Sequence, residues 1–184
     1  MSGVAVFGGQ FDPPHLGHLA VARAARDQLD LDVLVMPDGV PPHRPACGSA
    51  PADRLALAEL AFAGEPRIQV VPPLQRDRPV RTVEILERMT LEQPPRALHL
   101  LLGADQWAAF ASWSRPDRIR ELATLVVAPR PGVDVADPDV IVLDMEPVDL
   151  SSTEVREAIA SGDDPSRWVP AAVAAEIARR GLYR

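Results

Sequence analysis

The chain has 184 residues, of which 47% are hydrophobic and 24% charged, enough for one domain with a buried core. Its net charge of −7 disfavours broad binding to nucleic acid, and no apolar run approaches the ~20 residues that span a bilayer. The single cysteine, Cys47, excludes an internal disulfide framework and is typical of a reducing compartment. We therefore expect one domain over residues 1–184 in the cytoplasm, with no nucleic-acid or membrane partner.

Six apolar runs predict buried parallel strands, and helical patterns recur between most of them. This alternation predicts an α/β fold, a doubly wound, Rossmann-like and mostly parallel sheet with helices on both faces and a helical C-terminal end. The expected strands cover residues 4–7, 33–36, 68–71, 97–102, 125–128 and 140–143. The expected helices cover residues 16–29, 53–63, 82–89, 116–122, 153–160 and 170–180, with Gly181 as the C′ residue of the last one.

The most informative stretch lies between the first strand and the first helix and reads Gly-Gly-Gln-Phe-Asp-Pro-Pro-His-Leu-Gly-His, residues 8–18. Its glycine pair, Gly8 and Gly9, lets a ligand approach the backbone without meeting a Cβ atom. The helix N-terminus that follows offers free N–H groups and the positive end of a dipole to an anion. His15 and His18 share one helix face, so both are expected to contact a bound phosphate. The stretch predicts a nucleotide site.

Ligands of a doubly wound sheet bind beyond the carboxyl ends of its strands. The loops after the first, second, fourth and fifth strands therefore share one rim, which holds residues 8–18, 37–45, 103–105 and 130–132. On this rim we expect Phe11 to form a wall and Asp12 to hold its loop through an Asx-type turn.

A second stretch, residues 151–156, reads Ser-Ser-Thr-Glu-Val-Arg and opens a helix near the C-terminus. Taken alone, it has two interpretations. Ser151 and Glu154 have the spacing of a capping box, which needs no ligand. Alternatively, Arg156 lies one turn further on, where its guanidinium would reach a phosphate held at the helix start. Two such helix N-termini would hold the two ends of a triphosphate.

These two stretches resemble the HxGH and SSTxxR signatures of the nucleotidyltransferase superfamily. The rest of the chain resembles the bacterial nicotinate mononucleotide adenylyltransferase family, over essentially its whole length and in the expected order. The narrower resemblance rests on residues 40–44 (Val-Pro-Pro-His-Arg), 81–86, 103–105 with Trp113, 128–132 (Ala-Pro-Arg-Pro-Gly) and the ending from Trp168 to Tyr183.

The resemblance implies transfer of AMP from ATP to nicotinate mononucleotide in NAD biosynthesis, with deamido-NAD and pyrophosphate as products and no covalent enzyme intermediate. It implies catalytic roles for His15, His18 and Arg156, and Mg²⁺ that is bound mainly through the ATP phosphates rather than by protein ligands. The three catalytic residues are also implied to bind ATP. The other implied ATP-binding residues are Gly8, Gly9, Phe11, Gly103, Asp105 (on a ribose), Ser151, Ser152 and Thr153. The implied acceptor-binding residues are Arg44, Thr82, Trp113 and Arg130.

Four positions depart from the family pattern: Gln10 replaces Thr or Ser, Arg81 a frequent Tyr, Ile85 a common Thr, and Ser114 a common aromatic residue. All but Gln10 lie near the implied acceptor pocket. Nicotinamide mononucleotide and phosphopantetheine therefore stay open as alternative acceptors, although the stretches around Thr82, Trp113 and Arg130 favour nicotinate. A non-catalytic nucleotide-binding module is the alternative from another class, and the presence of every signature residue counts against it.

Overall fold

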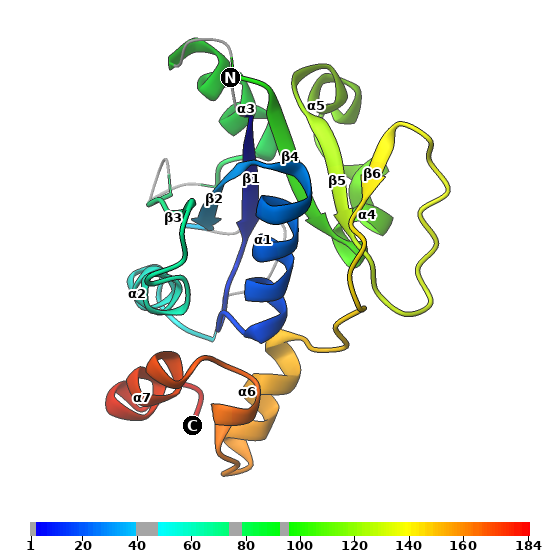
Figure 1. Ribbon diagram of the computed structural model, residues 1–184. Helices are drawn as coiled ribbons and strands as arrows, with labels where there is room; N and C mark the ends of the chain where they lie inside the picture. The colour runs from blue at the N-terminus through cyan, green and yellow to red at the C-terminus, as the bar shows by residue number, and fades with distance from the viewer. Residues whose placement is uncertain (1–2, 40–47, 74–78, 93–95) are drawn as a thin grey trace.

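The computed structural model describes residues 3–39, 48–73, 79–92 and 96–184. Within these residues a single sheet has six strands in the order β3-β2-β1-β4-β5-β6, and every neighbouring pair is parallel. Figure 1 shows the sheet with helices in front of it and behind it. The strands are β1 (Val4–Gly9), β2 (Asp32–Pro37), β3 (Ile68–Val70), β4 (Leu98–Gly103), β5 (Thr124–Ala128) and β6 (Val140–Val142). The predicted α/β class and parallel sheet are confirmed.

The helices lie mainly in the connections between strands. They are α1 (Leu16–Leu29), α2 (Pro51–Ala61), α3 (Thr82–Glu92), α4 (Ala104–Ala109), α5 (Pro116–Leu122), α6 (Ser152–Ala160) and α7 (Ala171–Arg180). Two short 3₁₀ turns, Phe110–Ser112 and Pro165–Arg167, follow α4 and α6. In the described part of the chain, no helix has both the length and the apolar character needed to cross a membrane.

The strands are mainly apolar because both faces of the sheet are covered. Side chains alternate between the faces along a strand. In β1, Ala5 and Phe7 pack into a core with α1, α2, α6 and α7. Val4 and Val6 of the same strand pack into a second core with α3 and α5. Such two-sided burial is typical of parallel sheets and explains why the strands show as continuous apolar runs.

Most predicted elements are confirmed, with ends that either match or differ by up to three residues. Gly181 ends α7 in the left-handed region, at φ 64°, as expected of a C-terminal cap. Residues 103–105 were expected in a loop, and this expectation is wrong because Ala104–Ala109 forms the helix α4. This helix has six residues, which is too short for a helical period to show.

The order of the strands places a switch point between β1 and β4. From β1 the chain winds outward through β2 and β3, and it then returns to β4 and winds the other way through β5 and β6. The two loops at this point leave the sheet in opposite directions, which opens a crevice at the carboxyl ends of β1 and β4. Gly8, Gly9 and Gly103 lie at those ends.

The two C-terminal helices pack beyond this same edge of the sheet. Figure 1 shows α6 and α7 below the sheet, near the first turn of α1, with the C-terminus between them. The backbone N–H of Leu16 donates to the carbonyl of Trp168 (2.8 Å), which joins the start of α1 to the α6–α7 connection. Ser152, at the start of α6, donates to the carbonyl of Pro13 just before α1 (2.9 Å), so the N-termini of both helices meet at the crevice.

Candidate active site

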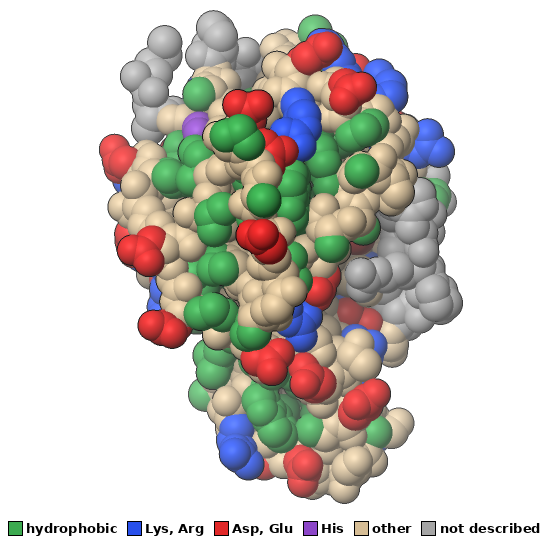
Figure 2. Space-filling view, turned by 90° about the vertical axis from the view of Figure 1, so that its right-hand side faces the viewer, with side chains coloured by type: hydrophobic (Ala, Val, Ile, Leu, Met, Phe, Trp, Pro, Cys, Tyr) green, Lys and Arg blue, Asp and Glu red, His purple; other side chains and the backbone are tan. Residues whose placement is uncertain are grey.

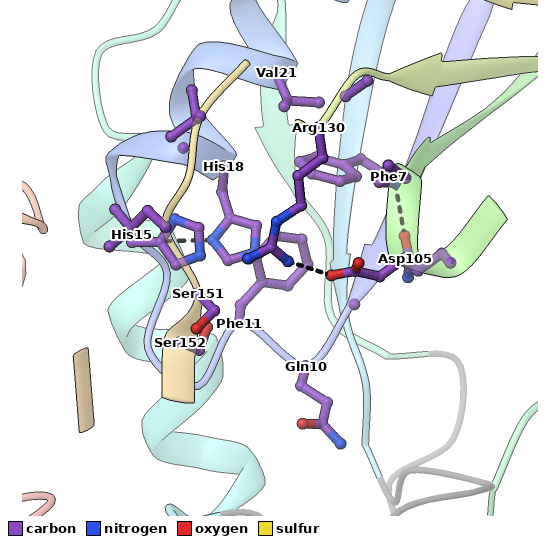
Figure 3. A pocket seen from close by; sticks show the side chains of 18 of the residues that line it. Phe7, Gln10, Phe11, His15, His18, Val21, Asp105, Arg130, Ser151 and Ser152 are labelled. Carbon is purple, nitrogen blue, oxygen red and sulfur yellow. Dashed lines mark hydrogen bonds and ion pairs between the residues drawn. The ribbon is translucent and has the colours of Figure 1, made fainter. Parts of the chain in front are cut away.

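A cavity of about 350 Å³ lies at the carboxyl ends of β1 and β4, between the N-termini of α1 and α6. Twelve predicted site residues line it, although they come from stretches up to 148 positions apart (from 8 to 156). They are Gly8, Gly9, Phe11, His15, His18, Gly103, Asp105, Arg130, Ser151, Ser152, Thr153 and Arg156. The close-up in Figure 3 shows His15 and His18 side by side, with Arg130 extending toward them.

The first turn of α1 orients the two histidines. His15 is the N-cap residue, and its backbone N–H donates to Nδ1 of His18 (3.1 Å). Because Nδ1 of His18 accepts this bond, the proton of the neutral ring lies on Nε2. His18 therefore offers one N–H donor, of defined tautomer, to a ligand in the cavity.

Gly17, between the histidines, is required by packing. A Cβ atom at this position would lie 3.0 Å from Nδ1 and Cε1 of His15 and 3.0 Å from Cγ1 of Val148. Any larger residue would push the His15 ring out of its place. The glycine of the His-Leu-Gly-His stretch thus makes room for the histidine before it.

Burial keeps both histidines neutral. Desolvation lowers the pKa of His15 from 6.5 to about 4, against a smaller opposing effect of the Glu154 carboxylate, while the Arg130 charge adds slightly to the lowering. Burial, followed by repulsion from His15, lowers the pKa of His18 well below its ordinary value. At neutral pH both rings are therefore uncharged hydrogen-bonding groups.

Phe11 forms the wall behind His18. Its backbone lies in the left-handed region at φ 50°, which is costly for a bulky residue and is held in place by the surrounding packing. The ring is 2% exposed and lies 4.8 Å from the His18 ring and 5.3 Å from Phe7, between centroids. It gives the cavity an apolar side next to the His18 donor.

The N-terminus of α6 forms the opposite side of the cavity. The capping box forms, since the Ser151 side chain accepts from the Glu154 N–H (3.2 Å) and the Ser151 N–H donates to the Glu154 carboxylate (2.7 Å). The box does not exclude a phosphate site, because Ser151 also lines the cavity. Both interpretations of this stretch thus describe the same helix start.

The remaining polar groups of α6 contact the histidine-bearing loop. Ser152 donates through Oγ to the carbonyl of Pro13 (2.9 Å). Arg156 donates through Nη1 to the carbonyl of Asp12 (2.7 Å) and through Nη2 to Oγ1 of Thr153 (3.1 Å). These bonds fix the two helix N-termini relative to each other.

Arg130 extends into the cavity from the loop after β5. Its guanidinium contacts Asp105 (2.5 Å) and Asp149 (3.3 Å), at the start of α4 and before α6. Figure 3 shows it between Asp105 and the histidines. The structure therefore places Arg130 with the histidines, whereas the family resemblance implies a place at the acceptor.

Comparison with known proteins agrees with this geometry. The cytidylyltransferase-like family model matches residues 6–158. A Salinibacter ruber protein named "Probable nicotinate-nucleotide adenylyltransferase" is 40% identical over 190 residues, which cover 98% of this chain and 97% of the relative. The chain belongs to the nicotinate-nucleotide adenylyltransferase family.

Solved structures of the nicotinate-nucleotide adenylyltransferase family share the fold. The putative enzyme of Vibrio parahaemolyticus superposes with a TM-score of 0.75 at 24% identity, covering 100% of this chain and 96% of its own. The nicotinic acid mononucleotide adenylyltransferase of Plasmodium falciparum complexed with NaAD gives a TM-score of 0.85 at 13% identity, covering 100% and 98%. The predicted family and fold are confirmed.

Two of the residues that the family resemblance assigns to the acceptor, Thr82 and Trp113, do not line the cavity. Thr82 begins α3, and Trp113 follows α4 and packs against Phe110, with ring centroids 5.7 Å apart. A bond of 3.4 Å from Arg81 Nη1 to Oγ of Ser114 joins the two segments. They therefore form one neighbourhood beside α3, separate from the residues that line the cavity. Arg44 lies outside the described residues.

Two glutamines for which no role was predicted, Gln10 and Gln106, also line the cavity. Gln106 accepts from the N–H of Gly103 (3.0 Å) and donates to the carbonyl of Gly8 (3.4 Å), which ties β4 to β1 beneath the ligand space. Its position three residues after the N-cap Gly103 was a usable signal, because a glutamine there typically returns to the cap. The buried Nε2 of Gln10 has no partner among the described residues.

The expected Asx turn at Asp12 is wrong. Pro13 and Pro14 follow it, and neither has an N–H group to donate to the carboxylate. The carboxylate instead contacts residues distant in sequence, namely Gly48, Ser49 and Tyr183.

The described residues contain no group of three or more His, Cys, Asp or Glu side chains placed to hold a metal ion. Asp105, at the cavity rim, is paired with Arg130. The donor set therefore fits a magnesium ion only if phosphate oxygens and water supply most of its ligands, as is usual for nucleotide-bound magnesium.

Proposed function

We propose that this cavity transfers AMP from ATP to nicotinate mononucleotide, forming deamido-NAD and pyrophosphate, and that residues 1–184 act as one domain. The observation that carries the proposal is the meeting of two helix N-termini, with His15, His18 and Arg156, in one cavity of a nicotinate-nucleotide adenylyltransferase fold. The single cysteine is consistent with a cytoplasmic enzyme.

The chemistry needs no catalytic base. The attacking group is a phosphate oxygen of the acceptor, which is already anionic at neutral pH. It attacks the α-phosphorus of ATP in line with the departing pyrophosphate, so one P–O bond forms as another breaks and no enzyme intermediate arises. The difficulty is to bring two polyanions together, and catalysis depends on positioning and on stabilising the developing charge.

His18 and the first turn of α1 would act at the α-phosphate. The neutral His18 ring donates through Nε2, and its orientation is fixed before the ligand arrives by the bond from the His15 N–H. A preoriented donor costs no reorganisation when charge develops on the phosphate. His15 lines the same space and adds a second imidazole.

The start of α6 would hold the β- and γ-phosphates. Ser152, Thr153 and Arg156 are already placed by bonds to the histidine-bearing loop and to one another. The guanidinium of Arg156 suits phosphate oxygens, which it can contact with two N–H groups. Magnesium, bound through the phosphates and water, would supply further charge neutralisation.

Asp105 would bind the ribose of the nucleotide, and Arg130 would contact its phosphates. Asp105 lies in the first turn of α4, close to the glycine that ends β4, where its carboxylate can accept from ribose hydroxyls. Arg130 brings a positive charge into the cavity of a protein whose net charge is −7. On the face of the molecule in Figure 2, acidic and basic side chains are interspersed and form no broad basic patch. Because the net charge is −7, local cations of this kind would attract the nucleotide.

The test is pyrophosphate release from ATP and Mg²⁺ with nicotinate mononucleotide, nicotinamide mononucleotide or phosphopantetheine supplied separately. We expect kcat/KM to be at least about ten-fold higher with nicotinate mononucleotide, which corresponds to ~1.4 kcal/mol of transition-state discrimination. Preference for another acceptor would retain the chemistry and move the specificity to Arg81, Ile85 and Ser114. Absence of turnover with all three would favour a non-catalytic nucleotide-binding module.

A further inference from the structure

The carboxylate of Asp12 joins three segments that are far apart in the chain. Asp12 is 1% exposed. Its carboxylate accepts from the backbone N–H of Gly48 (2.7 Å), from the hydroxyl of Ser49 and from the hydroxyl of Tyr183 (2.8 Å). Tyr183 is 171 residues away in sequence, and its hydroxyl also lies 3.1 Å from Oγ of Ser49. All three donors are neutral groups, and each stabilises the buried charge.

The backbone carbonyl of Asp12 in turn accepts a hydrogen bond from Nη1 of Arg156. Gly48 fills the narrow space between Arg156 and Tyr183. A Cβ atom on Gly48 would lie 3.0 Å from Cδ of Arg156 and 3.3 Å from Cδ1 of Tyr183. One residue, Asp12, thus contacts the tyrosine with its side chain and the arginine with its carbonyl, and Gly48 separates the two.

Tyr183 does not line the cavity, so it does not touch the nucleotide. The end of α7 places it, where the N–H of Leu182 donates to the carbonyl of Ile177 (3.1 Å) and Tyr183 itself turns into the left-handed region at φ 65°. Burial raises the pKa of the Tyr183 hydroxyl above its ordinary value, so the group remains a donor at every working pH. An effect of Tyr183 on the reaction would pass through its contacts with Asp12, Ser49 and Gly48.

We propose that Tyr183 is a positioning residue for nucleotidyl transfer, whose hydroxyl holds the Asp12 carboxylate and thereby fixes Arg156 at the phosphate end of the cavity. The proposal rests on the proposed function in that Arg156 binds the β- and γ-phosphates of ATP. When one of the three donors is lost, the carboxylate turns toward the other two. The loop carbonyl that accepts from Arg156 moves with it, and the guanidinium loses its alignment with the phosphates.

The test compares Tyr183→Phe, which removes only the hydroxyl, with Thr90→Val. Thr90 donates to the carbonyl of Glu87 (2.7 Å) on an exposed turn of α3, so this control also removes one hydroxyl hydrogen bond, away from the cavity. For Tyr183→Phe we expect KM and the calorimetric Kd for ATP to rise about 10-fold, with KM for nicotinate mononucleotide changed less than about two-fold, because small misplacements of a binding group are costly. Thr90→Val should keep wild-type values.

A second variant, Gly48→Ala, keeps every hydrogen-bonding group of the cluster and inserts a methyl group between Arg156 and Tyr183. It should weaken ATP binding in the same selective way. The inference is overturned if both variants lower the melting temperature while the folded proteins keep the wild-type KM and Kd for ATP, since a purely structural role predicts that pattern. If the wild-type protein fails to turn over nicotinate mononucleotide, the proposed function fails, and the ATP Kd of the variants still decides the positioning role.

Discussion

The imidazole rings of His15 and His18 lie almost face to face, with centroids 3.7 Å apart and planes inclined by 30°. Two positive charges at this separation would repel strongly, and burial already disfavours each of them. The pair is therefore built as two neutral rings rather than as a cationic phosphate clamp. Positive charge in the cavity comes from Arg130 and Arg156 instead.

The buried histidines should make the protein less stable in mild acid. The pKa of His15 is lowered from 6.5 to about 4, so between these values the unfolded chain binds a proton that the folded chain does not. Stability must then fall as the pH falls through this window. The variant His15→Gln lacks this titration. Relative to that variant, the free energy of unfolding of the wild-type protein should fall by about 2 kcal/mol between pH 7 and pH 5, at ~1.4 kcal/mol per pH unit. Urea unfolding of both proteins at several pH values measures this, and a constant difference would contradict a neutral, buried His15.

Loss of the His18 donor should slow the chemical step. For His18→Ala we expect kcat to fall on the order of 10²-fold, by analogy with removal of one oxyanion-hole donor. His99→Gln is the control, because His99 lies near the start of β4 and does not line the cavity. Steady-state pyrophosphate release measures both variants, and turnover near the wild-type level in His18→Ala would remove the proposed transition-state role.

Removal of the Arg130 charge should weaken ATP use. Arg130→Met keeps much of the side-chain volume and removes the guanidinium, so we expect kcat/KM for ATP to fall about 10- to 100-fold, in line with the loss of a hydrogen bond to a charged group. Arg118→Met removes a guanidinium that pairs with Glu87 and Glu121 on the surface, and it should leave kcat/KM unchanged. Equal kinetics of the two variants would place Arg130 outside the nucleotide site.

Arg54 should be a major contributor to stability, although it is charged. It is 1% exposed and donates to the backbone carbonyls of Ser49 (2.8 Å), Asp38 (2.6 Å) and Gly39 (2.6 Å). Arg54→Met would leave these carbonyls without their donor, and we expect the free energy of unfolding to fall by about 3 kcal/mol. Arg23→Met breaks a surface pair with Glu65 and should cost at most ~1 kcal/mol. Chemical denaturation of both variants gives the comparison.

The fold and the phosphate-binding stretches could be predicted because their signals are local. A short apolar run rich in branched residues and bounded by turn signals predicts a buried strand, and the glycine pair with two histidines is contiguous along residues 8–18. Helix α4 was missed because six residues give no period, and the Asx turn at Asp12 was wrong because two prolines follow it. The assignment of Thr82, Trp113 and Arg44 to the acceptor stays a prediction.

The sequence by itself determined the α/β class, the parallel strands and the two helix starts that carry the signature residues, since each depends on side chains within one turn or one strand. Only the tertiary structure decided which groups those residues contact. The pairing of Arg130 with Asp105, the bonds from buried Arg54 to the carbonyls of Asp38 and Gly39, and the bond between Asp12 and Tyr183 all join segments that meet after the sheet and its covering helices have packed. Hydrogen bonds and ion pairs act over a few ångströms. Two residues that are 171 positions apart in the sequence, such as Asp12 and Tyr183, can therefore be identified as partners only once the fold has brought them together.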